Sequence, residues 1–413
     1  MELRNRARFY AKVVNHLYGK RGIRGQLVTA TRGARHLSLG IRLANPLKLD
    51  DALRLANPLA LATSVPNILS QRLPTSPGLV SYQFELASGY WQTVTRADVT
   101  GLGVGLAEQR RQVDFTFDDA PHCLVAGNTG CGKSVGVASI LVGLCEVYTP
   151  DQLRVVLVDP DHDYEAFDNV RHLALPVARE YDEIDQALVW AGQELADRKE
   201  RNAKDAYRLL VVIDEAEDTL DDDERLAITQ AIARGGRKFR VNLLVSTQKP
   251  KQAKLPDLIN QLGNRFVGKC DNAQTSVLLT GHAGLQAHKL TAGGGDFLHI
   301  NGDIERLQIA MPMSRDYDRL LRAEVVWPTV ERQATPPILN IPVAREGGRP
   351  PTEIEPRKVA RYVVFGPDSI SISQAEELLG LKRRGHERHK EFAVELLDEI
   401  NRLQEALGRQ NYE

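Results

Sequence analysis

Cysteines are scarce in the sequence, and their spacing matches no familiar pairing. The 413 residues contain only Cys123, Cys131, Cys145 and Cys270, and no two of these form a C-x-x-C pair. In a chain of this length they are more simply interpreted as reduced core or loop residues than as disulfides or zinc ligands. A cytosolic compartment fits this pattern.

Long apolar runs are also missing. The longest, around ASILVGLCEV, is far shorter than the roughly 20 residues that a membrane-spanning helix needs. The first residues, MELRNRARFY, lack the apolar segment of a signal peptide. We therefore expect a soluble, cytoplasmic protein with no membrane contact.

Charge of one sign is not in excess over the whole chain. The 53 basic residues face 54 acidic ones, for a net charge of -1, so no global field attracts the chain to nucleic acid or anionic lipid. Two basic stretches stand out locally: nine Lys or Arg between Glu2 and Gly40, opposed only by Glu2, and KRRGHERHK at 382–390. Each is as typical of a solvated helix face or a flexible arm as of a DNA contact.

The pattern of apolar residues changes along the chain. From about 40 to 120, short apolar runs broken by Pro and Gly, with alternation in VSYQFELASGYWQTVTR, predict a mixed domain that contains strands. From His122 to about 327, the runs HCLVA, RVVLV, LLVVI and VNLLVS alternate with longer amphipathic stretches such as the helix predicted for YDEIDQALVWAGQELADRKE. That alternation predicts a parallel sheet with flanking helices.

These patterns divide the chain into four predicted parts. They are a mixed α/β N-terminal domain with a basic leading segment (1–110), an α/β domain with a parallel sheet (111–330), a Pro/Gly-rich linker (331–356) and a small helical unit (357–413). In the last part, Ser371 or Ser373 is a candidate helix cap and Gly380 a helix stop. The arrangement is compatible with a winged helix or helix-turn-helix, and equally with a helical hairpin that docks on a partner protein.

A phosphate-binding loop follows the strand HCLVA. The residues Gly127-Asn128-Thr129-Gly130-Cys131-Gly132-Lys133-Ser134 satisfy G-x-x-x-x-G-K-[ST], and Val135, also predicted to bind the nucleotide, begins the helix predicted for VGVASILVGL. Glycines let backbone N–H groups point at phosphate oxygens, and the helix N-terminus adds its positive end. In this context Lys133 is predicted to bridge the terminal phosphates of ATP and Ser134 to ligate Mg²⁺.

Polar residues at the ends of two later strands complete a predicted hydrolytic site. LLVVIDE supplies Asp214 and Glu215, an acid to hold the metal and a base to orient water. The strand VNLLVS is followed by Gln248, a candidate sensor of the terminal phosphate or a simple loop residue. ARGGRKFR adds Arg234, Arg237 and Arg240, one of which would reach a neighbour's nucleotide if subunits form a ring.

At this point the sequence resembles the FtsK/SpoIIIE family of ring-shaped DNA-pumping ATPases, within the wider FtsK–HerA group. The segments that carry the resemblance are PHCLVAGNTGCGKSVG, VDPDHDYEAFDNVRHL, LLVVIDEAEDTL and ARGGRKFRVNLLVSTQKP, in the family order between about 115 and 315. The weaker text from about 25 to 110 looks like the preceding β-rich half of such motors. The resemblance implies a RecA-like P-loop ATPase fold.

The resemblance also assigns roles to residues. It implies Lys133 and Ser134 on ATP and Mg²⁺, Asp214 on the metal through water, Glu215 as the base, and Gln248 as sensor. Arg237 falls where the family has its trans-acting arginine, and Arg265 coincides with another recurrent family arginine, which makes it a second candidate. Six subunits are implied by the family alone.

The sequence departs from the family in one region that matters for DNA. The family's pore-facing loop is basic, whereas this chain reads KCDNAQTSV with only Lys269 nearby, and Lys249, Lys251 and Lys254 are possible substitutes. The leading hypothesis is an ATP-driven motor for double-stranded DNA. A motor that acts on a protein substrate, and a nucleotide-gated scaffold, are the alternatives.

Overall fold

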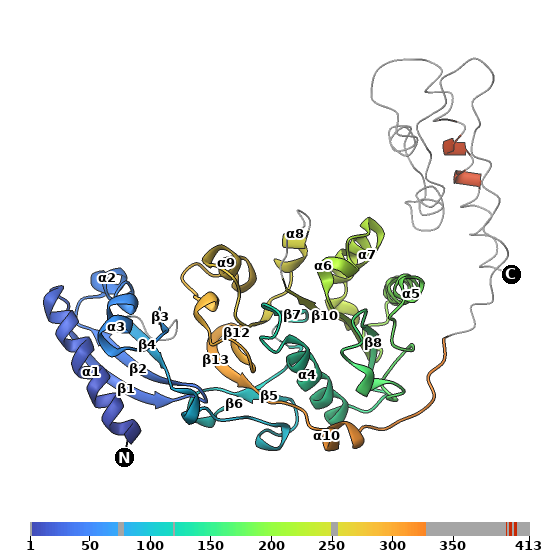
Figure 1. The fold of residues 1–413 in the computed structure, drawn as a ribbon. Helices are drawn as coiled ribbons and strands as arrows, with labels where there is room; N and C mark the ends of the chain where they lie inside the picture. The colour runs from blue at the N-terminus through green and yellow to red at the C-terminus, as the bar shows by residue number, and fades with distance from the viewer. Residues whose placement is uncertain are drawn as a thin grey trace. The chain divides into compact units, whose positions relative to one another are not determined.

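The computed structural model describes residues 2–72, 78–118, 120–248 and 255–327, together with 394, 396–398 and 400–402. The chain divides into two compact units, Met1–Trp327 and Pro328–Glu413. Almost all described residues belong to the first unit, which contains two β-sheets. The ribbon in Figure 1 follows the chain from the small sheet to the large one.

The N-terminal sheet has four antiparallel strands in the order β1-β2-β4-β3. Its strands and helices are α1 (Glu2–Lys20), β1 (Gly25–Arg32), β2 (His36–Leu43), α2 (Leu49–Leu53), α3 (Ala56–Thr63), β3 (Ile68–Arg72) and β4 (Leu79–Glu85). Alternate residues of β2 and β4, such as Leu39 and Tyr82, pack with Tyr10, Val14 and Tyr18 of α1. The period-2 pattern of the strands therefore puts one apolar face under the helix and leaves the opposite face polar.

The second sheet has nine strands in the order β6-β5-β13-β12-β11-β7-β10-β9-β8. Five of them are parallel: β7 (Cys123–Ala126), β8 (Leu153–Val158), β9 (Arg208–Ile213), β10 (Val241–Thr247) and β11 (Asn264–Val267). Four antiparallel strands extend them: β12 (Asp296–Asn301), β13 (Asp303–Ile309), β5 (Gly103–Leu106) and β6 (Gln112–Asp114).

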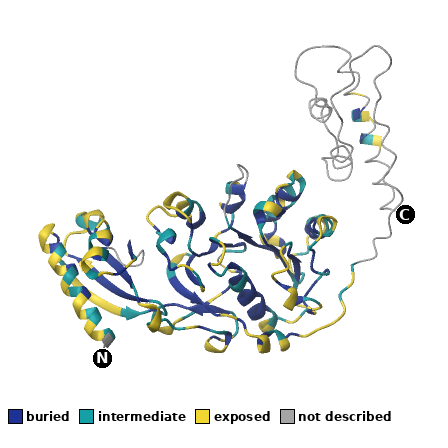
Figure 2. Ribbon diagram, in the orientation of Figure 1, coloured by how far each residue is buried: buried dark blue, intermediate teal, exposed yellow. Residues whose placement is uncertain are grey.

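Helices cover both faces of this sheet. The strands alternate between two cores: Leu209 and Val211 of β9 pack on the side of α5 and α7, whereas Leu210 and Val212 pack on the side of α4. The helices are α4 (Lys133–Val147), α5 (Tyr181–Glu200), α6 (Ala216–Thr219), α7 (Asp223–Gly235), α8 (Leu255–Ile259), α9 (Ala273–Thr280) and α10 (Ser314–Asp318). Figure 2 shows the central strands as buried, which explains their nearly continuous apolar sequence.

The predicted α/β fold with a parallel sheet and flanking helices is confirmed. The four predicted apolar runs form β7, β8, β9 and β10, and the helix predicted for 181–200 is α5. The strands β11, β12 and β13 were not predicted, and of VSYQFELASGYWQTVTR only the first part is a strand, β4. The chain passes from the small sheet to the large sheet between Glu85, the end of β4, and Gly103, the start of β5. Because β5 pairs with β13 of the large sheet, this passage comes before the domain boundary that was predicted at residue 110. The domain division remains a prediction.

Several predictions lie outside the described residues. They are the linker 331–356, nearly all of the C-terminal unit 357–413, and Lys249, Lys251 and Lys254. Within the described part of the chain, no helix combines the length and apolarity that crossing a bilayer requires.

Candidate functional site

The glycine-rich loop joins β7, near the middle of the large sheet, to the N-terminus of α4. Gly127, Gly130 and Gly132 have φ angles of 146°, 75° and 105°, in the region that favours glycine. A Cβ on Gly132 would lie 3.1 Å from the backbone nitrogen of Gly295, so this glycine is also required by a close backbone approach. The loop is thus shaped by its sequence and by the segment packed on it.

The loop presents unpaired donors and a buried cation. No backbone or side-chain acceptor among the described residues takes the N–H groups of Gly130, Gly132 or Ser134, and no side chain caps α4. Lys133 is only 6% exposed at its side chain, and its Nζ lies 3.8 Å from Oε1 of Glu215. Donors of this kind at a helix N-terminus suit phosphate oxygens.

Acidic residues collect at the carboxyl ends of β8 and β9. Asp214 is 2% exposed, and burial raises the pKa of its carboxyl group. Burial likewise raises the pKa of Glu215, against the opposing effects of the hydrogen bond from Gln248 and of Lys133. Asp159, which follows β8, is fully buried and accepts the N–H groups of Asp163 and Tyr164 at 2.8 and 3.1 Å. Neighbouring desolvated carboxylates are stabilised by a cation between them.

Gln248 links the phosphate-binding loop to Glu215. Its Oε1 accepts a hydrogen bond from Thr129 Oγ1 at 2.5 Å, and its Nε2 donates to Oε1 of Glu215. Glu215 itself has φ 39° and ψ 58°, a left-handed conformation that is uncommon outside glycine and that sets its side chain at the start of α6. The structure therefore brings together side chains from the ends of β7, β9 and β10.

Asp163 belongs to the same site, although the sequence analysis gave it no role. Its Oδ2 accepts a hydrogen bond from Ser134 Oγ, 29 residues away in sequence. The available signal was the Asp-rich segment VDPDHDY, which follows a buried strand and so ends at the same edge of the sheet.

A cavity of about 580 Å³ lies over these groups. Its polar walls include Lys133, Ser134, Asp163, Glu215 and Gln248. Its remaining lining residues include Arg35, Thr93, Val94, Thr129, Gly130, Gly132, Val135, Asp161, Gly294, Gly295, Gln308, Ile309 and Met311. The lining contains both charged groups and the apolar residues Val94, Ile309 and Met311, as a ligand with charged phosphates and an apolar base requires.

The donors present also fit a magnesium ion. No cluster of three or more His, Cys, Asp or Glu within the described ranges is placed to hold a metal. Magnesium in nucleotide sites takes only one or two protein groups, with phosphates and waters as the other ligands. The hydroxyl of Ser134, with Asp163 against it and Asp214 nearby in the buried cluster, supplies oxygen donors of that kind.

Other sequence candidates lie elsewhere. Arg237, in a 3₁₀ turn at Arg237–Phe239, is exposed and does not line the cavity of its own chain. Arg265 is 7% exposed and donates to the backbone carbonyls of Ile259, Leu262, Leu278 and Leu279 at 2.7 to 3.3 Å. Its guanidinium therefore forms hydrogen bonds within the core of its own subunit. Asn128 ties the phosphate-binding loop to the segment after β11: its backbone N–H donates to Lys269 O and its side-chain amide donates to Asp271 Oδ1.

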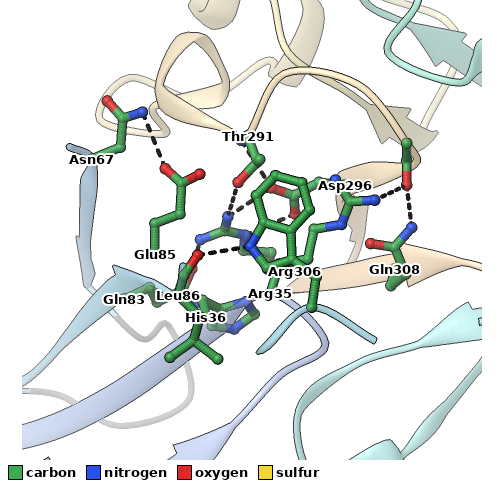
Figure 3. A network of polar contacts seen from close by, with 12 residues as sticks. Arg35, His36, Asn67, Gln83, Glu85, Leu86, Thr291, Asp296, Arg306 and Gln308 are labelled. Carbon is green, nitrogen blue, oxygen red and sulfur yellow. Dashed lines mark hydrogen bonds and ion pairs between the residues drawn. The ribbon is translucent and has the colours of Figure 1, made fainter. Parts of the chain in front are cut away.

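The small sheet reaches the same cavity through Arg35. Figure 3 shows Arg35, in the turn between β1 and β2, with His36 and Gln83 of the small sheet, close to Asp296 and Arg306 of the large sheet and to Thr291 in the loop before β12. Arg306 and Asp296 form an ion pair at 2.6 Å, each with a side chain 3% exposed. The junction between the sheets is therefore a buried polar network, so its parts depend on one another for their hydrogen bonds.

A glycine-rich loop at a helix N-terminus, with the paired carboxylates Asp214 and Glu215 after β9, which is separated from β7 by β10, defines a P-loop nucleotide-binding domain. Residues 85–266 match the FtsK/SpoIIIE family model. The match supports an FtsK/SpoIIIE-type P-loop ATPase domain in this part of the chain, as the sequence resemblance predicts.

Curated relatives include proteins named as DNA translocases. The chain is 27% identical to DNA translocase FtsK 1 of Neisseria meningitidis serogroup A over 294 residues, which covers 58% of this chain and 36% of that protein. It is 29% identical to DNA translocase SftA of Bacillus subtilis over 248 residues, covering 53% and 25%. A 79-residue segment is 43% identical to DNA translocase FtsK of Rickettsia typhi, covering 19% and 11%. The chain thus spans about a third or less of the length of these relatives.

Solved structures that resemble this chain do so at low identity. The pCW3 conjugation coupling protein TcpA, in a monomer form with ATPgS, is 20% identical with a TM-score of 0.46, covering 74% of this chain and 95% of that chain. The cytoplasmic domain of the type VII secretion ATPase EccC of Thermomonospora curvata is 20% identical with a TM-score of 0.45, covering 51% and 28%.

Proposed function

We propose that the protein hydrolyses ATP and uses the energy to move double-stranded DNA, as a ring of subunits. The observation that carries the catalytic part is the convergence of Lys133, Glu215 and Gln248 on one cavity from the ends of three strands. The DNA part is supported by the names of the curated relatives.

Each residue then has one task. The free N–H groups of the loop and Lys133 hold the phosphates of ATP, and Glu215 orients the attacking water with its carboxylate. Gln248 forms hydrogen bonds with both Thr129 of the phosphate-binding loop and Glu215. When ATP binds to the loop, Gln248 would transmit the change to the carboxylate that acts as the base. Ser134 and Asp214 would hold Mg²⁺, which would supply positive charge against the phosphates.

Ring formation accounts for the position of Arg237. Its side chain makes no hydrogen bond or ion pair to another described residue, and it lies outside the cavity of its own chain. We propose that it reaches the nucleotide of a neighbouring subunit, where a guanidinium stabilises the charge of the transition state. Six subunits, and a partner protein for the C-terminal unit, remain predictions from the resemblance and the sequence.

The first test is steady-state ATP hydrolysis with and without long linear duplex DNA at low salt, with Glu215→Gln as the blank. We expect duplex DNA to stimulate turnover several-fold. Turnover that is indifferent to DNA would overturn the DNA part and favour a protein substrate, whereas absence of turnover under all conditions would overturn the catalytic part.

Helix α1 offers a described surface for DNA. Arg4, Arg8, Lys12, His16 and Lys20 recur every fourth residue and are exposed, so they form one stripe, which we call the α1 stripe. It runs for about 24 Å at 1.5 Å per residue. No described carboxylate forms an ion pair with it, while the opposite face of α1 is buried on the small sheet. The like charges of Arg4, Arg8 and Lys12 at this spacing cost the helix about 0.2–0.5 kcal/mol per pair, a cost that phosphates would offset.

Reversing two charges of the α1 stripe tests this surface. The double variant Arg8→Glu with Lys12→Glu is expected to weaken duplex binding at low salt by tenfold or more. The slope of log K against log salt concentration should also become shallower by about 2, since each phosphate contact contributes about 0.9 to it. Basal ATP hydrolysis should be unchanged because the stripe does not line the cavity.

The matched control is Arg201→Glu with Lys204→Glu, two exposed basic residues after α5. Fluorescence anisotropy with a labelled duplex measures both variants. Equal loss of binding in the two would indicate only a general charge effect and would contradict a specific role of α1.

A further inference from the structure

The loop Gly293–Gly295 connects the phosphate-binding loop to the small sheet. Its three glycines have φ angles of 75°, 73° and 83°, so the backbone curls in a way that other residues rarely adopt. The N–H of Gly295 donates to Cys131 O at 2.9 Å, inside the phosphate-binding loop. We call this segment the glycine loop.

Arg35 holds the glycine loop from the other side. It lies in the turn between β1 and β2, 258 residues from Gly293 in sequence, and its Nη1 donates to Gly293 O at 2.7 Å. Its Nη2 donates to Gly294 O, also at 2.7 Å, and its guanidinium lies 4.5 Å from the centre of the Trp91 ring. A planar guanidinium with two donors on consecutive carbonyls fixes orientation as well as distance.

A side chain at Gly294 would displace Arg35 from the glycine loop. A Cβ on Gly294 would lie 2.2 Å from Nη2 of Arg35, and Gly294 O also accepts a hydrogen bond from Nε2 of Gln308. Gly295 O accepts the N–H of Ile309 at 2.8 Å, which anchors the loop to β13. The glycine loop is therefore held between Arg35, β13 and the phosphate-binding loop.

Arg35, Gly294 and Gly295 line the same cavity as Gly130, Gly132 and Lys133. The small sheet thus contributes to the wall of the cavity, although it lies outside the residues matched by the family model, 85–266. A ligand that fills this cavity contacts the phosphate-binding loop and the glycine loop together.

We propose that Arg35 is a positioning residue that couples nucleotide binding to the small sheet through the glycine loop. The proposal rests on the proposed function in that the ligand is a nucleoside triphosphate. Arg35 keeps the glycine loop against Cys131 and so keeps the phosphate-binding loop in its binding conformation. Because coupling is reciprocal, bound nucleotide also restrains the turn between β1 and β2.

The test compares Arg35→Ala, Arg35→Lys and the parent for binding of a fluorescent, non-hydrolysable ATP analogue and for ATP turnover. We expect Arg35→Ala to weaken binding and raise KM about tenfold with kcat at saturating ATP within about twofold of the parent, and Arg35→Lys to recover part of the affinity. The matched control is Arg32→Ala, which removes a single bond of 2.9 Å to Tyr90 O in the same region, at a residue that does not line the cavity.

Hydrogen exchange distinguishes coupling by Arg35 from a purely structural role, because only coupling predicts that nucleotide binding slows exchange in the small sheet. In the parent, nucleotide should slow exchange in peptides covering 25–43 and 291–296, and in Arg35→Ala the slowing should persist in the phosphate-binding loop but vanish in 25–43. Parent affinity in Arg35→Ala, or a fall of kcat and melting temperature together with no change in KM, would overturn the proposal. A parent that binds no nucleotide would instead overturn the proposed function.

Discussion

Replacing Glu215 with glutamine is expected to lower ATP turnover by about 10²- to 10⁴-fold while ATP binding is retained, which is the range for loss of a general base. Oε1 of Glu215 lies 3.8 Å from Lys133 Nζ and accepts the amide of Gln248. A glutamine has the same shape and can still bond to Gln248, but its amide cannot act as a carboxylate toward water. Steady-state hydrolysis and binding of a fluorescent ATP analogue, measured side by side, check both halves.

A nearby carboxylate provides the control for this result. Asp218→Asn alters an exposed acidic residue of α6, three positions along the chain, and should turn over ATP at close to the parent rate. Normal turnover in Glu215→Gln would remove Glu215 from the mechanism. Equal loss of binding and turnover would show that the substitution damages the cavity, so that the role of base is not supported.

Replacing Arg237 with alanine is expected to reduce turnover by about 10³- to 10⁵-fold, the range for a trans-acting arginine. The fold should be unaffected because Arg237 is exposed and makes no side-chain bond to the described residues. Its defect should also be complemented. Lys133→Ala protein retains Arg237, so in a mixed ring it can complete the site of an Arg237→Ala neighbour whose Lys133 is intact.

Measuring hydrolysis in mixtures of the two inactive proteins over a range of ratios checks this prediction. Activity should reach a maximum at intermediate ratios and be absent at either end. Arg234→Ala, at an exposed position three residues earlier on α7, is the matched control and should keep the parent rate. A parent rate in Arg237→Ala alone, or no activity in any mixture, counts against a trans role for this arginine.

Some residues of the candidate site can be predicted from sequence patterns, and others cannot. The phosphate-binding loop and Asp214-Glu215 could be predicted because each is a short motif next to a strand, and both lie at the carboxyl edge that α/β sheets use for ligands. Asp163 was missed because its partner Ser134 is 29 residues away and no fixed spacing joins them. Arg265 illustrates the reverse: its position in the sequence suggests a role in trans, and its burial among backbone carbonyls ties it to the core.

The sequence by itself determined the parallel core, the phosphate-binding loop and the family resemblance, because periodicity, glycine spacing and short motifs are properties of neighbouring residues. Only the tertiary structure decided that β12 and β13 extend the sheet beside β11, and that Arg35 and the glycine loop meet at the cavity. Such contacts arise where distant segments are brought together by strand pairing, and loop closure over 258 residues leaves no trace in local composition. The contribution of the small sheet to the wall of the cavity could therefore be seen only in the tertiary structure.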